Sequence, residues 1–133
     1  MKLTFKTHKN IEVIFDYLTD MQKFVSVHPV IYKIDQLSEN NYLVFETLKF
    51  GFIPFSFTYP VVILKNEIEK SVIIKATVFR LTKIEMRFIL KAENDVTDIH
   101  EEILIKSPLP VKFMMEGIFR KQHHQLFNNI ELK

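Results

Sequence analysis

The chain has 133 residues and a formal net charge of +2, from 18 lysines and arginines against 16 aspartates and glutamates. It contains no cysteine and only two glycines, which excludes a disulfide framework, a thiolate metal site and a glycine-rich phosphate loop. Thirteen phenylalanines and a hydrophobic content of 47% predict a single folded domain over residues 1–133 with a large core.

The first predicted elements are a short strand and two short helices. Leu3 and Phe5 alternate with polar residues, which is typical of a strand. Asn10 is expected to cap a helix whose apolar residues recur at helical spacing: Ile11, Ile14, Phe15 and Leu18. Thr19 and the glutamine three residues later form a capping-box pattern, so a second helix is predicted there, ending before Pro29.

From Val30 to Lys106 the pattern changes to period two and is rich in β-branched and aromatic residues. Turn-forming residues interrupt it near 38–41, 51–54, 66–70, 80–82 and 92–95. The spacing predicts six strands joined by hairpin-length turns, and therefore an antiparallel sheet.

The pairing of these strands can be tested, because a one-residue slip exchanges the two faces of a strand. If Phe50 faces Phe55 across a four-residue turn at 51–54, the apolar residues of both strands share one face. Repeating the test at the next three hairpins keeps the apolar residues together on that face. It predicts a row of neighbours across five strands: Glu46, Tyr59, Ala76, Met86 and Glu101.

Residues 110–132 are predicted to form a long amphipathic helix. Its apolar face comprises Val111, Met114, Met115, Ile118, Phe119, Leu126 and Ile130, with Gln122 near the centre of that face. Phe113 and Phe127 fall roughly opposite, so both are expected to be exposed.

This order of elements, with a final helix held by a curved antiparallel sheet, resembles the helix-grip fold of the SRPBCC superfamily. The local support is the passage VIFDYLTDMQKFVSVHP at 13–29, the aromatic strand pair around FGFIPFSFTYP at 50–60, and the closing helix that ends in LFNNIELK. The superfamily includes START lipid-transfer domains, the birch pollen allergen family and polyketide cyclase-like proteins. The resemblance implies an α+β fold, in which a seven-stranded curved antiparallel sheet wraps around a long C-terminal helix and two short helices follow the first strand. It also implies a hydrophobic cavity, but no particular reaction.

The polar row on the apolar inner face gives the leading hypothesis, which is binding of a small hydrophobic molecule as a carrier or sensor. Ligand pockets typically combine apolar walls with a few converging polar groups. The expected polar anchors are Glu46, Tyr59, Glu101 and Gln122, and the expected walls are Phe57, Ile74, Phe88, Ile103, Met115, Ile118 and Phe119. Ala76 and Met86 complete the site, since the short side chain of Ala76 leaves room for a ligand.

Other interpretations stay open. The aromatic residues are also compatible with a filled core, in which Glu46 and Glu101 reach water at the sheet margins and Tyr59 bonds locally. A cyclase or dehydratase would use Tyr59 or Glu101 as an acid or base. An interaction protein or homodimer would use exposed phenylalanines at Phe52, Phe113 and Phe127.

The histidines do not indicate a metal site. His28 is expected at a chain corner, with a donor at the mouth of the pocket as the alternative. His100 is expected on the outer, solvated face of a strand. His123 and His124 are adjacent, so on a helix they point about 100° apart and are poorly placed to share a metal ion. No cofactor is predicted.

Charge and hydropathy also limit the expected partners. No sequence segment concentrates lysine and arginine, so no nucleic-acid partner is expected. The first ten residues lack the apolar core of a signal peptide, and no run of 18 apolar residues exists, so no transmembrane segment is predicted. A cytoplasmic location is the expectation.

Overall fold

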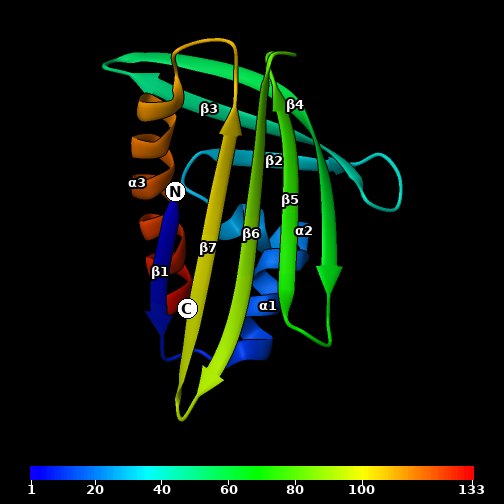
Figure 1. Cartoon of the computed structure of the whole chain (residues 1–133), viewed down its shortest axis with the longest axis vertical. Coiled ribbons are helices and arrows are strands. Elements are labelled where there is room, and N and C mark those ends of the chain that lie inside the picture. Colours follow the sequence, from blue (N-terminus) through cyan, green and yellow to red (C-terminus); the bar gives the residue numbers. More distant parts are fainter.

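The computed structural model describes all residues, 1–133. Its seven strands and three helices follow the predicted order (Figure 1). The elements are β1 (Lys2–Thr7), α1 (Ile11–Thr19), α2 (Met21–Val27), β2 (Ile31–Gln36), β3 (Asn41–Phe50), β4 (Ile53–Asn66), β5 (Ser71–Val78), β6 (Thr82–Glu93), β7 (Val96–Lys106) and α3 (Lys112–Glu131).

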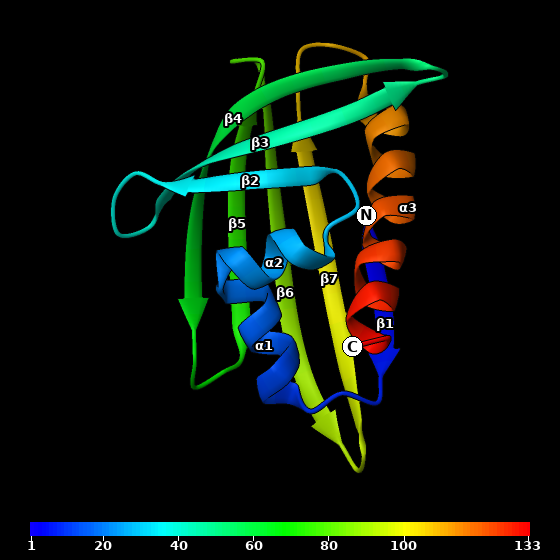
Figure 2. The ribbon, with the colours of Figure 1, turned by 180° about the vertical axis from the view of Figure 1, so that it is seen from behind.

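The strands form one antiparallel sheet in the order β1-β7-β6-β5-β4-β3-β2. The sheet bends strongly, so that β2 and β3 cross over the ends of β5, β6 and β7 (Figure 1). All three helices lie on its concave side, with α1 and α2 beneath β2 and α3 along β1 and β7 (Figure 2). The predicted α+β helix-grip architecture is therefore confirmed.

The two short helices begin at side-chain caps. The Asn10 side chain accepts a hydrogen bond from the Glu12 backbone N–H, as the sequence predicts. The predicted cap of the second helix is wrong by one residue. Asp20 caps α2 by accepting from the N–H groups of Gln22 and Lys23, whereas Thr19 ends α1 and donates to the Phe15 carbonyl.

The faces of the strands are as predicted, but the pairing at each of the four tested hairpins is displaced by two residues. Glu46 lies opposite Phe57 and Val44 opposite Tyr59, because the β3–β4 turn contains only Gly51 and Phe52. A two-residue displacement leaves every side chain on its own face, so polarity does not detect it. The predicted five-residue row is therefore wrong: Glu101 pairs with Phe88, and Met86 with Ile103.

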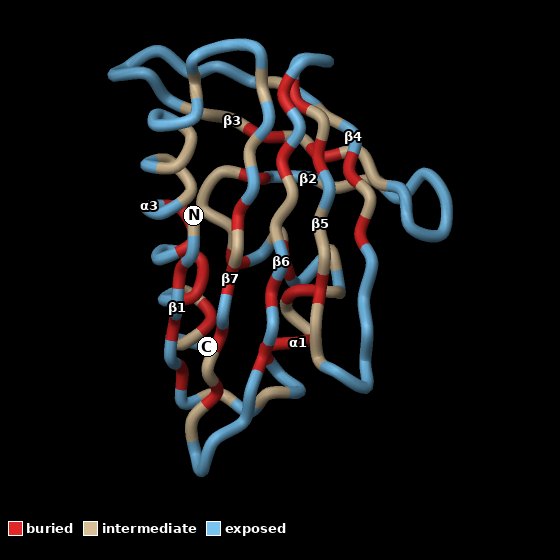
Figure 3. Tube along the Cα trace, viewed as in Figure 1, coloured by how far each residue is buried: buried red, intermediate tan, exposed pale blue.

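Helix α3 has two contrasting halves. Its C-terminal half packs against β1, and His123 also contacts Glu101 of β7. The buried residues of this half are Gln122, His123, Leu126, Phe127 and Ile130. Its N-terminal half is mostly exposed, as the tube coloured by burial shows (Figure 3). Phe113 is exposed as predicted, but the prediction for Phe127 is wrong, because Phe127 packs its ring 4.6 Å from that of Phe5.

The core below the cavity region is densely filled. Ile14 and Leu18 of α1 and Leu126 and Ile130 of α3 have no exposed surface. Burial of each of these side chains stabilises the folded state by about 1.5–3 kcal/mol. The Asn129 amide also donates to the Val27 carbonyl at 2.8 Å, which holds α3 against the end of α2. This packing fixes the buried half of α3 and leaves the other half over the cavity.

None of the three helices combines the length and the hydrophobicity that a membrane-spanning helix needs.

Candidate functional site

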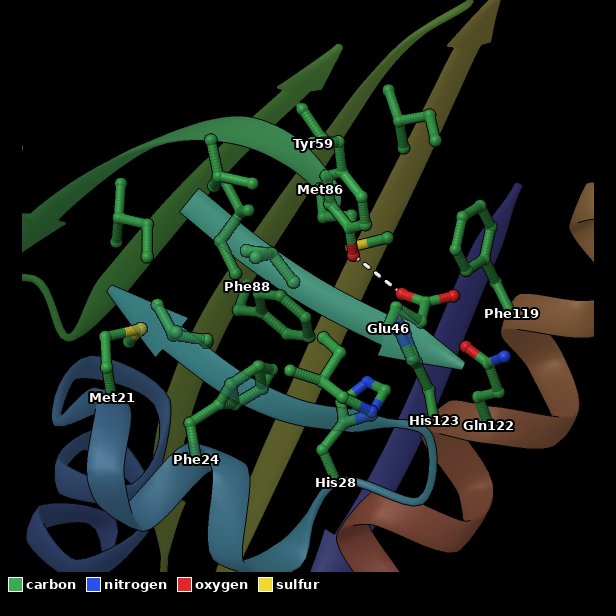
Figure 4. A pocket seen from close by; sticks show the side chains of 18 residues that line it. Met21, Phe24, His28, Glu46, Tyr59, Met86, Phe88, Phe119, Gln122 and His123 are labelled. Atoms are coloured by element: carbon green, nitrogen blue, oxygen red, sulfur yellow. Dashed lines mark hydrogen bonds between the residues drawn. The ribbon is translucent and has the colours of Figure 1, made fainter. Parts of the chain in front are cut away.

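Two adjoining chambers lie between the helices and the concave face of the sheet. The inner chamber, of about 50 Å³, is enclosed by α2, by strands β2 to β6 and by α3 (Figure 4). Fourteen of its 18 lining residues are hydrophobic. Its polar members are His28, Glu46, Gln122 and His123.

The outer chamber, of about 160 Å³, extends from the inner one toward the β3–β4 and β5–β6 turns and the start of α3. Sixteen of its 18 lining residues are hydrophobic. The two chambers share six lining residues: Glu46, Tyr59, Ala76, Ile84, Met86 and Phe119. The two chambers therefore adjoin, and the polar lining residues are concentrated at the inner one.

Glu46 and Tyr59 form the polar contact at the junction. The Tyr59 hydroxyl donates to Glu46 Oε1 at 2.7 Å (Figure 4). Burial raises the pKa of the Glu46 carboxyl, although the bond from Tyr59 and the nearby His123 oppose this. Burial and the neighbouring carboxylate also raise the pKa of Tyr59 well above its usual value, so the phenol stays protonated and remains a donor.

His28 turns the chain into β2 and also lines the inner chamber. Its Nδ1 accepts hydrogen bonds from the backbone N–H groups of Val30 and Ile31, with N···N distances of 3.2 and 3.1 Å. Burial, and to a smaller extent the nearby His123, lower the pKa of His28 to about 3. The ring is therefore neutral near pH 7, with Nδ1 as acceptor and the proton on Nε2.

His123 and Glu101 form a buried pair between α3 and β7. His123 Nδ1 lies 2.8 Å from Glu101 Oε1 and 2.6 Å from Oε2. In the tautomer with the proton on Nδ1, His123 donates to the Glu101 carboxyl group, and Nε2 is the second polar atom of a ring that lines the inner chamber. Glu101 thus acts behind His123 and orients it.

Several polar atoms around the inner chamber have no hydrogen-bond partner within the protein. They are Nε2 of His28, Oε2 of Glu46, the side-chain amide of Gln122 and Nε2 of His123, whereas His28 Nδ1, Glu46 Oε1 and His123 Nδ1 are hydrogen-bonded. His28 supplies a donor, and the Gln122 amide supplies both a donor and an acceptor. Because these groups approach the chamber from α2, β3 and α3, the chamber suits one small polar group, such as a hydroxyl or carbonyl (Figure 4).

Eleven of the thirteen residues predicted from the sequence line the chambers. They are Glu46, Phe57, Tyr59, Ile74, Ala76, Met86, Phe88, Met115, Ile118, Phe119 and Gln122. Glu101 and Ile103 do not, because Glu101 is turned toward His123 and Ile103 is packed into the core.

The sequence prediction missed the two histidines of the inner chamber. For His28 the corner role is preferred over a donor at the pocket mouth, and its Nδ1 does perform the corner role. His123 was considered only together with His124. Its spacing from Phe119 and Phe127, four residues either way, was the signal that places it on the buried face of α3.

Comparison with known proteins identifies the fold. No family model and no curated protein matches the sequence. The structure superposes on Ara h 8.0201 with a TM-score of 0.76 at 14% identity, covering 98% of this chain and 93% of that chain. For the START superfamily protein from Mycobacterium smegmatis the TM-score is 0.75 at 16% identity, with the same coverage. For the Zhui aromatase/cyclase from Streptomyces sp. R1128 it is 0.69 at 9% identity, covering 98% and 90%.

At these identities the likeness establishes the fold alone. The chain has the helix-grip fold of the SRPBCC superfamily that its sequence resembles.

Proposed function

We propose that the protein binds a small hydrophobic molecule with one polar end and acts as its carrier or sensor. The observation that carries this proposal is that the two chambers adjoin, with unpartnered polar atoms at the inner one and apolar walls at the outer one. Fold relatives that include a START superfamily protein support a ligand-binding role.

The size of the chambers limits the ligand. Pockets for drug-sized molecules usually measure about 300–1,000 Å³. The outer chamber measures about 160 Å³ and the inner one about 50 Å³, so the expected ligand is smaller, such as a bicyclic aromatic alcohol or a short acyl chain. Met86, Met114 and Met115 in the walls allow the shape of the site to adapt.

Calorimetric titration with 2-naphthol tests this proposal. The chain has two alanines: Ala76 at the junction of the chambers and exposed Ala92 on β6. We expect saturable binding at one site per chain in the unaltered protein and in the control Ala92→Leu. Ala76→Leu fills the junction and should weaken binding at least tenfold, or by about 1.4 kcal/mol. Equal binding by both variants, or none by the unaltered protein, would contradict the proposal.

Acid–base catalysis of a cyclase or dehydratase type is the second candidate function. It is supported by the raised pKa of Glu46, because a buried carboxyl with a raised pKa accepts a proton more readily than an ordinary one. The proposed acid or base is therefore Glu46 with Tyr59, in place of Glu101. Glu46→Gln should abolish turnover of a linear polyketone analogue, which mass spectrometry measures. Calorimetry should still detect binding of the analogue to this variant.

The remaining expectations stay as proposals from the sequence. They are a single domain over 1–133, a cytoplasmic location, no cofactor and no nucleic-acid partner.

A further inference from the structure

Exposed apolar side chains gather at one end of the molecule, around the outer chamber. This loop end consists of residues 48–55, 78–83 and 105–114, which form the β3–β4 turn, the β5–β6 turn and the approach to α3. These 24 residues hold nine of the 17 large hydrophobic side chains that the molecule exposes: Phe50, Phe52, Ile53, Phe55, Phe79, Leu81, Leu109, Phe113 and Met114. Phe52 is fully exposed and Phe113 is 92% exposed.

The three segments meet in space at the top of Figure 1. The ring centroid of Phe79, in the β5–β6 turn, lies 6.0 Å from that of Phe55 and 5.2 Å from that of Phe57. The hydroxyls of Thr82 and Ser107 are 2.8 Å apart and join the β5–β6 turn to the approach to α3. Exposed apolar side chains from all three segments border the outer chamber: Phe50, Phe55, Phe79, Leu109 and Met114.

The charges of this surface are all of one sign. The loop end carries five basic residues and no acidic one: Lys49, Arg80, Lys83, Lys106 and Lys112. All five are exposed, and none makes an ion pair. The rest of the chain has 13 basic and 16 acidic residues, and six of its lysines are paired with carboxylates.

We infer that the loop end is a docking surface for an anionic lipid bilayer. Exposed aromatic side chains ringed by lysine and arginine match a membrane surface, where rings enter the interface and cations meet lipid phosphates. A second copy of this chain fits less well, because a symmetric contact would bring two sets of five positive charges together. The contact would be peripheral and would not span the membrane.

Several lining residues of the outer chamber are themselves exposed at the loop end, such as Phe50, Phe79 and Met114. Docking in this orientation therefore places that end of the chamber against the lipid. A hydrophobic ligand could then pass between bilayer and cavity without crossing water. This consequence rests on the proposed function, whereas the docking itself does not.

Co-sedimentation with ligand-free vesicles tests the inference. One set of vesicles is phosphatidylcholine alone, and in the other about a third of the lipid is phosphatidylglycerol. The protein should sediment with the second set and not with the first. Each cation close to an anionic surface strengthens binding about fivefold, so Lys49→Glu with Lys112→Glu should reduce the partition coefficient at least tenfold. The control is Lys2→Glu with Lys91→Glu, which makes the same change in net charge at exposed positions outside the loop end.

The apolar contribution is tested with Phe52→Ser and Phe113→Ser together. Its control is Ile68→Ser, since Ile68 is 96% exposed but lies at the opposite end of β4 between Glu67 and Glu69. The phenylalanine variant should lose at least tenfold in partitioning and the control should not.

Two outcomes would overturn the inference. One is an unaltered protein that stays in the supernatant with both kinds of vesicle. The other is a dimer in analytical ultracentrifugation that Phe52→Ser with Phe113→Ser dissociates, without any vesicle binding. Because no ligand is present, a failure here leaves the calorimetric test of the cavity unaffected.

Discussion

Four polar residues, His28, Glu46, Gln122 and His123, give the inner chamber its chemistry within an otherwise apolar interior. Burial shifts the pKa values of two of them in opposite directions, downward for His28 and upward for Glu46. Both shifts favour the neutral form, as expected where charge is separated from water. The chamber therefore disfavours charge at these two groups, which favours an uncharged polar group on the ligand.

The stability of the protein should fall as the pH drops below 6.5, because of His28. Its pKa is about 3 in the folded chain and near 6.5 when unfolded, so between these values only the unfolded chain binds the proton. The expected slope is up to about 1.4 kcal/mol per pH unit, measured by urea denaturation between pH 6.5 and 5.

His28→Asn is the control for this slope. The Asn side chain retains an acceptor for the backbone N–H groups but does not titrate. Glu46 acts with the opposite sign, since its raised pKa makes the folded state less stable as the pH rises above about 4.5. Comparing the unfolding free energies of the unaltered protein and His28→Asn at the same pH isolates the contribution of His28. Equal slopes of stability against pH in the two proteins would refute that contribution.

The Glu101–His123 pair should be strongly coupled. Glu101→Leu or His123→Leu alone leaves a buried polar partner unpaired, and each is expected to cost about 3–5 kcal/mol of unfolding free energy. The double variant replaces both groups by apolar ones and should lose less than the sum. Additive losses in a denaturation double-mutant cycle would show that the contact contributes nothing.

Residue contacts were only partly predictable from the sequence. Glu46 and Tyr59 do meet, although as diagonal and not directly opposite neighbours. Glu101 was assigned to the cavity because strand polarity places it on the inner face. The alternation of polar and apolar residues along β7 does not reveal that Glu101 contacts His123 of α3.

Turn chemistry sets the strand pairing at the scale of elements. The β3–β4 hairpin closes with Gly51 at φ +66°, and Phe79, Arg80 and Asn94 also adopt positive φ in the later turns. Alternation of apolar residues predicted each strand and its face correctly. Alternation does not distinguish between strand registers that differ by two residues, and the length of each turn selects one of them.

The two glycines should respond oppositely to alanine. Gly51→Ala places a Cβ on a left-handed residue, so about 1 kcal/mol of stability should be lost. Gly117 lies inside α3 with no atom near an added Cβ, so Gly117→Ala should gain up to about 1 kcal/mol from helix propensity. Thermal denaturation checks both, and a loss at Gly117 would show that the start of α3 requires its glycine.

Over the whole molecule, the thirteen phenylalanines separate into different roles. Phe5 and Phe127 fill the core, Phe57, Phe88 and Phe119 line the chambers, and Phe52 and Phe113 lie on the docking surface. The order and type of elements, and hence the fold, followed from periodicity in the sequence. The basic loop end did not, because its five cations come from three separate segments that only the folded sheet brings together.

Methyl-resolved NMR during a 2-naphthol titration tests the central claim most directly. The methyl groups of Met86, Ile84 and Met115 line the chambers, whereas Ile53 lies on the docking surface and Ile68 at the far turn. Saturable shifts at Met86, Ile84 and Met115, with Ile53 and Ile68 unchanged, are the predicted result. Shifts confined to Ile53, or none at the chamber methyls at saturating naphthol, would contradict a ligand-binding cavity.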